Sequence, residues 1–262
     1  TVEPDSPAGK ALKKGDLVIG AYGHLFEKER DPRVPLGYAL ADAKSEARNG
    51  QLILDVVRGQ EVLQVNIELG VQGSYRETWP FNCPKSDAVG RKVLRNVLNT
   101  KGDTGVSFWW DGLFLLGMDD HEALELVRRS AYRLAKKKNL GYGGLNSWWS
   151  SYALVTLCEY YLLTGDSAVL ESVAKLVEVL EKGQMTCGSW SHGCPPGGYG
   201  AVNQVGSVCY MGLVLAREAG LEVDRDVLLR SIRFFGKGVG ACMPYGDHTV
   251  TASHYHGAAY NG

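Results

Sequence analysis

Hydrophobic and polar residues alternate over short distances in the first 69 residues, which is the pattern of β-strands. Residues 16–26 (DLVIGAYGHLF) predict a strand with a glycine-marked turn, and residues 50–69 predict a hairpin that turns at residues 58–61. The segment between them has helical spacing and ends at an Asn-Gly pair, a common stop for a helix. Its apolar positions are Leu36, Ala39, Leu40 and Ala43. The first part therefore predicts a small α+β unit with one helix across a sheet.

From about residue 86 onward, the hydrophobic period lengthens to that of α-helices. Residues 119–137, 165–183 and 223–238 each place apolar side chains three and four positions apart, as amphipathic helices do. The three expected buried stripes are Leu124, Val127, Ala131 and Leu134; Val169, Val173, Val177 and Leu180; and Val227, Leu228, Ile232 and Phe235. The second part is thus predicted to be all-α.

A more apolar segment precedes each amphipathic segment, so the second part contains an internal repeat. These segments are residues 105–117, 146–165 and 203–220, and FLLGMDD in the first repeat aligns with YLLTGDS in the second. A helical hairpin in such an array buries its apolar face against neighbouring hairpins. The repeat therefore predicts a helical solenoid or a closed ring of hairpins, with the apolar helices in the inner layer.

The first part resembles a bacterial PDZ domain. Residues 6–26 (SPAGKALKKGDLVIGAYGHLF) match its Ser-Pro-Ala turn, Lys-Gly-Asp turn and following strand, and the helix and closing hairpin come in the PDZ order. The resemblance implies that a C-terminal peptide, free or part of a protein, adds as a strand beside the helix, where Leu36, Leu40 and Ala43 would line the groove. The loop that holds the peptide carboxylate would precede Thr1. A PDZ-like domain used only for packing is the alternative.

Residues 70–87 (GVQGSYRETWPFNCPKSD) contain two prolines, several turn-forming residues and no sustained period, so they predict a linker. The expected organisation is a PDZ-like domain over residues 1–69 without its first strand and carboxylate loop, a linker over 70–85, and a helical repeat domain over 86–262. Because the last helix pair looks unfinished, we expect the repeat domain to be incomplete.

The stretch QMTCGSW spaces Gln184, Gly188 and Trp190 as Q-x-x-x-G-x-W, directly after an amphipathic helix. This spacing resembles the Gln-Trp repeat of squalene and terpene cyclases, which build α/α toroids. The resemblance implies that the Gln and Trp brace successive helices and take no part in chemistry. Similar glycine-rich loops, GYGG, GGYGAVNQ and PYGDH, lie at corresponding places in the repeats. With the PDZ-like unit, the chain resembles a two-part bacterial family of unknown function whose second domain is a partial α/α toroid.

Composition excludes some classes of partner. The 262 residues carry a formal net charge of −1, which gives no electrostatic footprint for nucleic acid. No window is long and apolar enough for a membrane span. The six cysteines are too few for a disulfide scaffold, and Cys158 and Cys209 fall in apolar helical runs. If a leader precedes residue 1, a periplasmic or secreted protein is expected.

Two short motifs invite a catalytic or metal interpretation. Squalene-type cyclases use an acid from an Asp-x-Asp-Asp stretch, but here Asp119 and Asp120 follow Gly-Met, and we expect the pair to cap the next helix. Cys187, His192 and Cys194 have side chains that suit zinc, but their spacing fits no established metal pattern, so an ordered loop is favoured. No cofactor is expected.

Aromatic and polar residues occur at the N-terminal ends of the apolar helices, which in a toroid would surround one mouth of the cavity. Aromatic rings beside amide groups suit a sugar or a small polar ligand, whereas adjacent tryptophans could instead fill the core. The candidates for ligand binding are Trp110, Asn146, Trp149, Tyr199, Asn203 and Gln204. Asp111, Asp247 and His248 are weak candidates for acid and base catalysis.

Two functions remain open from the sequence. The first is a binding or scaffold protein with a PDZ-like module and a toroid cavity. The second is a carbohydrate-active or lipid-active enzyme, such as a glycosidase, a lyase or a cyclase-like enzyme, with its site at the toroid mouth. Acid and base side chains that converge on an open pocket would favour the enzyme, and tryptophans that close the cavity would favour the scaffold.

Overall fold

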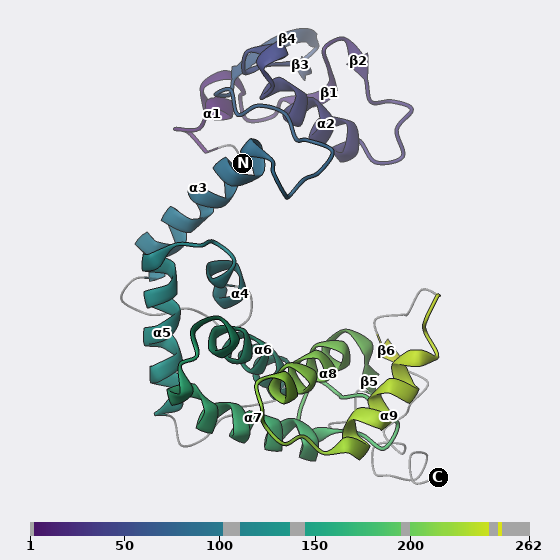
Figure 1. Cartoon of the computed structure of the whole chain (residues 1–262). Coiled ribbons are helices and arrows are strands. Elements are labelled where there is room, and N and C mark those ends of the chain that lie inside the picture. The colour runs from purple at the N-terminus through teal and green to yellow at the C-terminus, as the bar shows by residue number, and fades with distance from the viewer. Residues whose placement is uncertain (1–2, 102–110, 137–144, 195–199, 241–245, 248–262) are drawn as a thin grey trace. The chain divides into compact units, whose positions relative to one another are not determined.

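The computed structural model describes residues 3–101, 111–136, 145–194, 200–240 and 246–247 (Figure 1). The chain forms two compact units, Thr1–Val93 and Leu94–Gly262. The division falls within helix α3 (Pro84–Lys101), an element that the sequence pattern did not single out. The first unit contains a small antiparallel sheet, and the second is mostly helical.

The sheet of the first unit has the strand order β2-β1-β3-β4, and all its pairs are antiparallel. The predicted hairpin is confirmed, because β3 and β4 pair along their whole length and turn between Arg58 and Glu61. The glycine-marked turn joins β1 to β2 through Tyr22 and Gly23, both at positive φ. The strands are β1 (Leu17–Ala21), β2 (His24–Leu25), β3 (Gln51–Arg58) and β4 (Glu61–Glu68).

Helix α2 (Arg33–Ala43) packs against β1 and β3 and confirms the predicted helix across the sheet. The candidate groove residues lie on its packed face: Leu36 and Leu40 are half-buried against the core of this unit, and Ala43 is fully buried. They therefore contribute to the packing of the unit. The short helix α1 (Pro7–Ala11) lies against β4, and the single turn η1 (Glu46–Arg48) follows α2.

An internal carboxylate and an ion pair fasten the two ends of this sheet. Asp55 on β3 is buried and accepts hydrogen bonds from the backbone N–H of Gly23 (2.8 Å) and from Gln64 Nε2 (2.9 Å). At the opposite end, the Arg58 guanidinium donates two hydrogen bonds, of 2.8 and 2.7 Å, to the two carboxylate oxygens of Asp16. That bidentate pair lowers the pKa of the Asp16 carboxyl to about 2.

Helices of the second unit come in successive pairs, α4 with α5, α6 with α7 and α8 with α9. Figure 1 shows α5, α7 and α9 along the outer side of an arc, with α4, α6 and α8 inside it. Two short strands, β5 and β6, pair antiparallel beside α8. The elements are α4 (Asp111–Leu116), α5 (His121–Ala135), α6 (Asn146–Thr164), η3 (Ser167–Val169), α7 (Leu170–Gly183), β5 (Ala201–Val202), α8 (Asn203–Glu218), α9 (Arg225–Gly236) and β6 (Gly246–Asp247).

Burial follows most of the predicted stripes. On η3 and α7, Val169, Val173, Val177 and Leu180 are at most 4% exposed, and α6 is buried on nearly every side, as its apolar composition requires. The stripe on α9 was partly wrong, because Ile232 is 51% exposed. The small neighbouring residue Ser231 is fully buried instead, at the contact with the loop after α7.

The start of α5 confirms the capping interpretation of the Asp pair. Asp120 occupies the N-cap position, and its side chain accepts a hydrogen bond of 3.0 Å from the backbone N–H of Ala123. Asp119 adopts a left-handed backbone conformation just before it. Asp119 therefore forms part of the turn before α5, and Asp120 caps the N-terminus of that helix.

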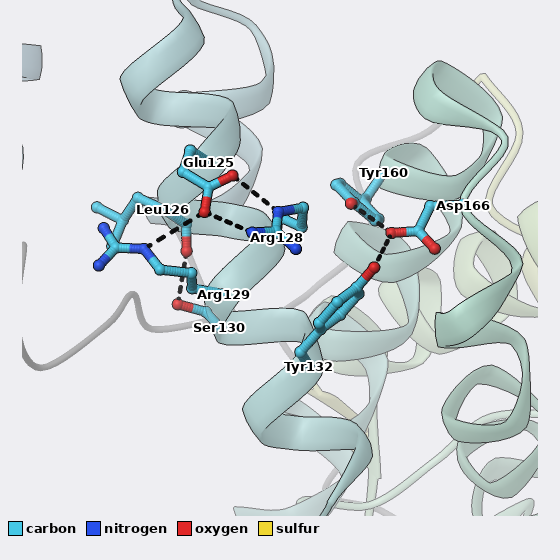
Figure 2. Close-up of polar contacts among 8 residues, drawn as sticks. All are labelled: Glu125, Leu126, Arg128, Arg129, Ser130, Tyr132, Tyr160 and Asp166. Carbon is cyan, nitrogen blue, oxygen red and sulfur yellow. Dashed lines mark hydrogen bonds and ion pairs between the residues drawn. The ribbon is translucent and has the colours of Figure 1, made fainter.

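One carboxylate ties the first helical pair to the second (Figure 2). Asp166 Oδ2 accepts hydrogen bonds from Tyr132 on α5 (2.9 Å) and from Tyr160 on α6 (2.7 Å). Its other oxygen accepts from the backbone N–H of Ala168, at the start of η3. These contacts, led by the Tyr160 hydroxyl, lower the pKa of Asp166, and burial raises the pKa of Tyr160.

Candidate functional site

The loop after α7, residues 184–194, passes the N-terminal ends of two inner helices. Ser147 at the start of α6 donates from its backbone N–H to the carbonyl of His192, at 3.0 Å. Val202, directly before α8, donates likewise to the carbonyl of Trp190, at 2.8 Å. The loop is thereby fixed to both helix ends, so we take this loop and these ends as the candidate site.

Gln184 is the residue that joins this loop to α9. Its Nε2 donates to the backbone carbonyl of Val227 and to Ser231 Oγ, both at 2.9 Å, and to the carbonyl of Gly188 at 3.3 Å. Its Oε1 accepts from Arg230 Nε at 2.8 Å. Every polar atom of this side chain is therefore used to connect α7, the loop and α9.

Gly188 makes the close approach of the loop to α9 possible. Its φ of +97° lies in a region that residues with a Cβ atom rarely adopt. A Cβ atom at this position would stand 2.2 Å from the backbone carbonyl oxygen of Arg230. Only glycine fits here, for both reasons.

Trp190 fills the space between the loop and α7. The ring is completely buried, and its Nε1 donates to the carbonyl of Leu180 at 2.7 Å. That carbonyl lies in the last turn of α7, where backbone acceptors lack a partner within the helix. The three motif residues thus all act as structural contacts.

Asn146, a ligand-binding candidate, is occupied by the same loop. It is the first residue of α6 and is 8% exposed. Its Nδ2 donates to the carbonyl of Cys194, and its Oδ1 accepts from the backbone N–H of Cys194. The neighbouring Ser147 hydroxyl lies 3.1 Å from Cys194 Sγ, and burial raises the pKa of that thiol. The amide here pins a backbone segment, and the thiol is held in its protonated form.

The candidate zinc ligands do not gather into a metal site. Across the described ranges, no group of three or more His, Cys, Asp or Glu side chains is arranged to hold a metal ion. His192 Nδ1 accepts a hydrogen bond of 2.7 Å from Trp148 Nε1, and the two rings stack with centroids 6.0 Å apart. Cys187 and Cys194 are both half-buried thiols. All three residues belong to the loop of residues 184–194.

Two inner helices begin with a polar candidate residue, α6 with Asn146 and α8 with Asn203, and Asp111 is the first described residue of α4. Asp111 is half-buried and Asn203 is 8% exposed. Gln204, the next residue of α8, is exposed to solvent. Trp149 is half-buried against the helical core. The predicted position at a helix start is confirmed for Asn146 and Asn203. The exposure of the candidate side chains differs from one residue to the next.

Strand β6 brings the fourth loop to the start of α8. Asp247 pairs with Ala201 and Gly246 with Val202. The backbone of Asp247 therefore lies beside Ala201, which comes two residues before Asn203 in the chain. This pairing had no sequence signal, because each strand is two residues long. The remaining candidates Trp110, Tyr199 and His248 lie outside the described residues.

Two functional partners of the loop were missed from the sequence. Arg230 and Ser231 complete the hydrogen bonds of Gln184, but they lie 46 and 47 residues away along the chain. Small residues in the helices could have indicated where the loop packs. A Cβ atom on Gly206 would meet Ser189 Oγ at 2.3 Å, so the glycine marks where the loop packs on α8.

A family model covers residues 86–262, and its description is "Domain of unknown function (DUF6288)". The chain belongs to this family. The family description assigns no activity or ligand. No curated protein and no solved structure matches the chain. In the part of the chain that the structure describes, no helix has the length and hydropathy needed to cross a bilayer.

Proposed function

We propose that this chain is a binding or scaffold protein, in which a PDZ-like module precedes a braced helical domain of the α/α toroid type. The contacts made by the residues of the Gln-Trp motif support this proposal. Gln184 and Trp190 connect successive outer helices and the loop between them, which is the role that the resemblance to the terpene cyclases implies for a Gln-Trp repeat. Neither side chain has a polar atom left for substrate.

The observation that carries the proposal is the state of Asn146. An amide at the start of an inner helix is well placed for a sugar or another polar ligand, but here its oxygen and nitrogen both bind the backbone of Cys194. His192 is likewise engaged by Trp148. The polar groups best suited to chemistry at this end of the inner helices are therefore occupied by hydrogen bonds that hold the loop. This end then serves as a rigid surface for binding.

Among the candidates that the structure describes, exposed Gln204 and half-buried Asp111 and Trp149 remain for a ligand at this end. An aromatic ring beside an amide and a carboxylate suits a sugar or a small polar molecule. In the first unit, the partner is a peptide or protein C-terminus, which would add beside α2. The helix position agrees with that mode, since α2 lies against β1 and β3.

A carbohydrate-active or lipid-active enzyme is the second candidate, and one observation favours it. The pairing of β6 with β5 holds the backbone of Asp247 close to the start of α8, where Asn203 lies. Asp111 is the first described residue of α4, another helix of the inner layer, and could supply one carboxylate while Asp247 supplies the second. Two carboxylates are the usual machinery of glycoside hydrolysis.

Polysaccharides, oligosaccharides and polar lipids should be screened both for binding and for turnover with the whole chain. A binding protein gives saturable binding and no product, and Gln204→Ala weakens the binding. An enzyme gives product that disappears in Asp111→Asn and Asp247→Asn while the melting temperature stays unchanged, and that result would reject the proposal. For the first unit, the probe is a set of peptides ending in a free hydrophobic residue, with amidated peptides as controls, because PDZ-type binding requires the carboxylate.

A further inference from the structure

Three aromatic side chains stand exposed on one short segment of the first unit, residues 75–81, which we call the aromatic loop. Tyr75 is 50% exposed, Trp79 63% and Phe81 76%. The rings of Tyr75 and Trp79 touch, with centroids 6.0 Å apart. Large apolar side chains gathered on an exposed loop are a common mark of an interaction site, because their burial in a partner is favourable.

The aromatic loop is held in shape by its own contacts, although its rings are exposed. Arg76 donates from its backbone to Cys83 Sγ at 3.5 Å and from its guanidinium to the carbonyl of Asn82 at 3.2 Å. Buried Lys85 places its ammonium 4.6 Å from the centre of the Tyr75 ring and donates to a backbone carbonyl of α2. The segment is thus ordered before it meets a partner, which lowers the entropic cost of binding.

Apolar exposure continues from the loop onto α3. Val89 and Val93 are 40% and 43% exposed, and their spacing of four residues puts them on one face of the helix. This helix starts three residues after Phe81. The aromatic loop and the first half of α3 together expose five large hydrophobic side chains within nineteen residues of sequence.

Exposed positive charge lies on a different side of the same helix. Residues 75–93 contain four Lys or Arg, of which Lys85 is buried, and two Asp or Glu, in a chain whose net charge is −1. Arg91 and Lys92 on α3 are exposed, and none of the ion pairs between described residues includes them. With 3.6 residues per turn, Arg91 lies on the side of the helix opposite the two valines, and Lys92 lies between these two sides. Their charge is therefore open to an anionic partner that also accepts aromatic side chains.

We propose that the aromatic loop and α3 dock on an anionic lipid surface. Trp, Tyr and Phe side chains partition into the headgroup region of a bilayer, and nearby Lys and Arg are attracted to anionic lipids. The exposed rings of the aromatic loop enter the interface, and Arg91 and Lys92 of α3 contact phosphate groups beside the loop. This surface binding needs no membrane-spanning helix and is independent of the ligand proposed for the helical domain.

The test is co-sedimentation of the whole chain with vesicles of phosphatidylcholine alone and of phosphatidylcholine mixed with phosphatidylglycerol. Binding to the mixed vesicles should be at least about tenfold stronger and should weaken with added salt. The double variant Trp79→Ala, Phe81→Ala should lose about tenfold in binding to the mixed vesicles. The variant Arg91→Gln, Lys92→Gln should remove most of the preference for the anionic lipid.

The matched control is Tyr38→Ala, Val62→Ala, which removes two side chains of the same unit that are 73% and 68% exposed and should leave vesicle binding unchanged. Equal binding to both kinds of vesicle, or no binding, overturns the proposal. So does a lower melting temperature of the Trp79, Phe81 variant, since it would show that these rings pack within the protein. Dimers of the wild type that this variant abolishes would assign the surface to a second copy of the chain and would also overturn the proposal.

Discussion

Gln184, the C-cap residue directly after α7, donates a hydrogen bond of 2.9 Å to the backbone carbonyl of Val227 in α9, 43 residues further along the chain. The same amide nitrogen reaches Ser231, and the amide oxygen receives Arg230. One side chain therefore joins two outer helices and the loop between them. We therefore expect this junction to contribute directly to the stability of the second unit.

Replacing Gln184 with Ala should lower the free energy of unfolding by about 2–3 kcal/mol, because it leaves partners of the amide without a hydrogen bond in a largely buried site. Urea denaturation followed by circular dichroism measures this loss. Gln204→Ala is the matched control, since it removes the same side chain from an exposed helical position. Equal stability of the two variants would contradict the bracing role.

Gly188→Ala should destabilise the protein more than Gly165→Ala does, although both glycines have positive φ. At Gly165, a Cβ atom meets nothing within 4 Å, so only backbone strain of about 1 kcal/mol is expected. At Gly188, the added atom also collides with the carbonyl of Arg230, and the loss should exceed about 2 kcal/mol. Thermal melts of the two variants would decide, and similar melting temperatures would show that the loop moves away from α9 at little cost.

The contact of Asp166 with two tyrosines should make the helical unit sensitive to acid. Because the Tyr160 and Tyr132 hydroxyls lower the pKa of this carboxyl, its contribution to stability is complete above its ordinary pKa of about 3.9 and is lost as the pH falls through the lower folded value. Asp166→Asn should therefore be less stable than wild type by about 1 kcal/mol near pH 6, with the difference shrinking below pH 4.

Unfolding curves at several pH values test this relationship, and Tyr132→Phe separates the contribution of the contact between α5 and η3. The control is Glu178→Gln, which changes an exposed ion pair with Lys182 on α7 and should have little effect at any pH. If the difference between Asp166→Asn and wild type were the same at pH 3 and pH 6, the tyrosine contacts would not stabilise the charged form.

The ion pair of Asp16 and Arg58 should protect the sheet of the first unit in the same direction. Its geometry lowers the pKa of Asp16 to about 2, so its contribution is complete above pH 4 and is lost as the pH falls toward 2. Asp16→Asn should speed amide hydrogen exchange in β1 and β3 at neutral pH, and much less so near pH 2. Asp31→Asn is the control, because the Asp31 and Arg33 pair is exposed on the surface. Unchanged exchange at neutral pH would contradict the prediction.

Local patterns in the sequence were sufficient for the order and type of most elements. The hairpin at residues 51–68, helix α2, and the three apolar and three amphipathic helices of the second unit follow from hydrophobic periods of two and 3.6 residues. Such periods report which face of an element is buried, and that is a property of neighbouring residues. The capping role of Asp120 is equally local, since the acceptor and donor are three residues apart.

Tertiary structure alone decided which side chains are free and which are occupied. Sequence placed Asn146 at a helix start, but only the fold shows that the backbone of Cys194, 48 residues later, takes both ends of its amide. Ile232 follows the helical period and is nevertheless exposed, because Ser231 packs against the loop at Gly188. Contacts between residues far apart in the chain leave no periodic trace, so the sequence determined the helices, and their packing determined what the candidate site can bind.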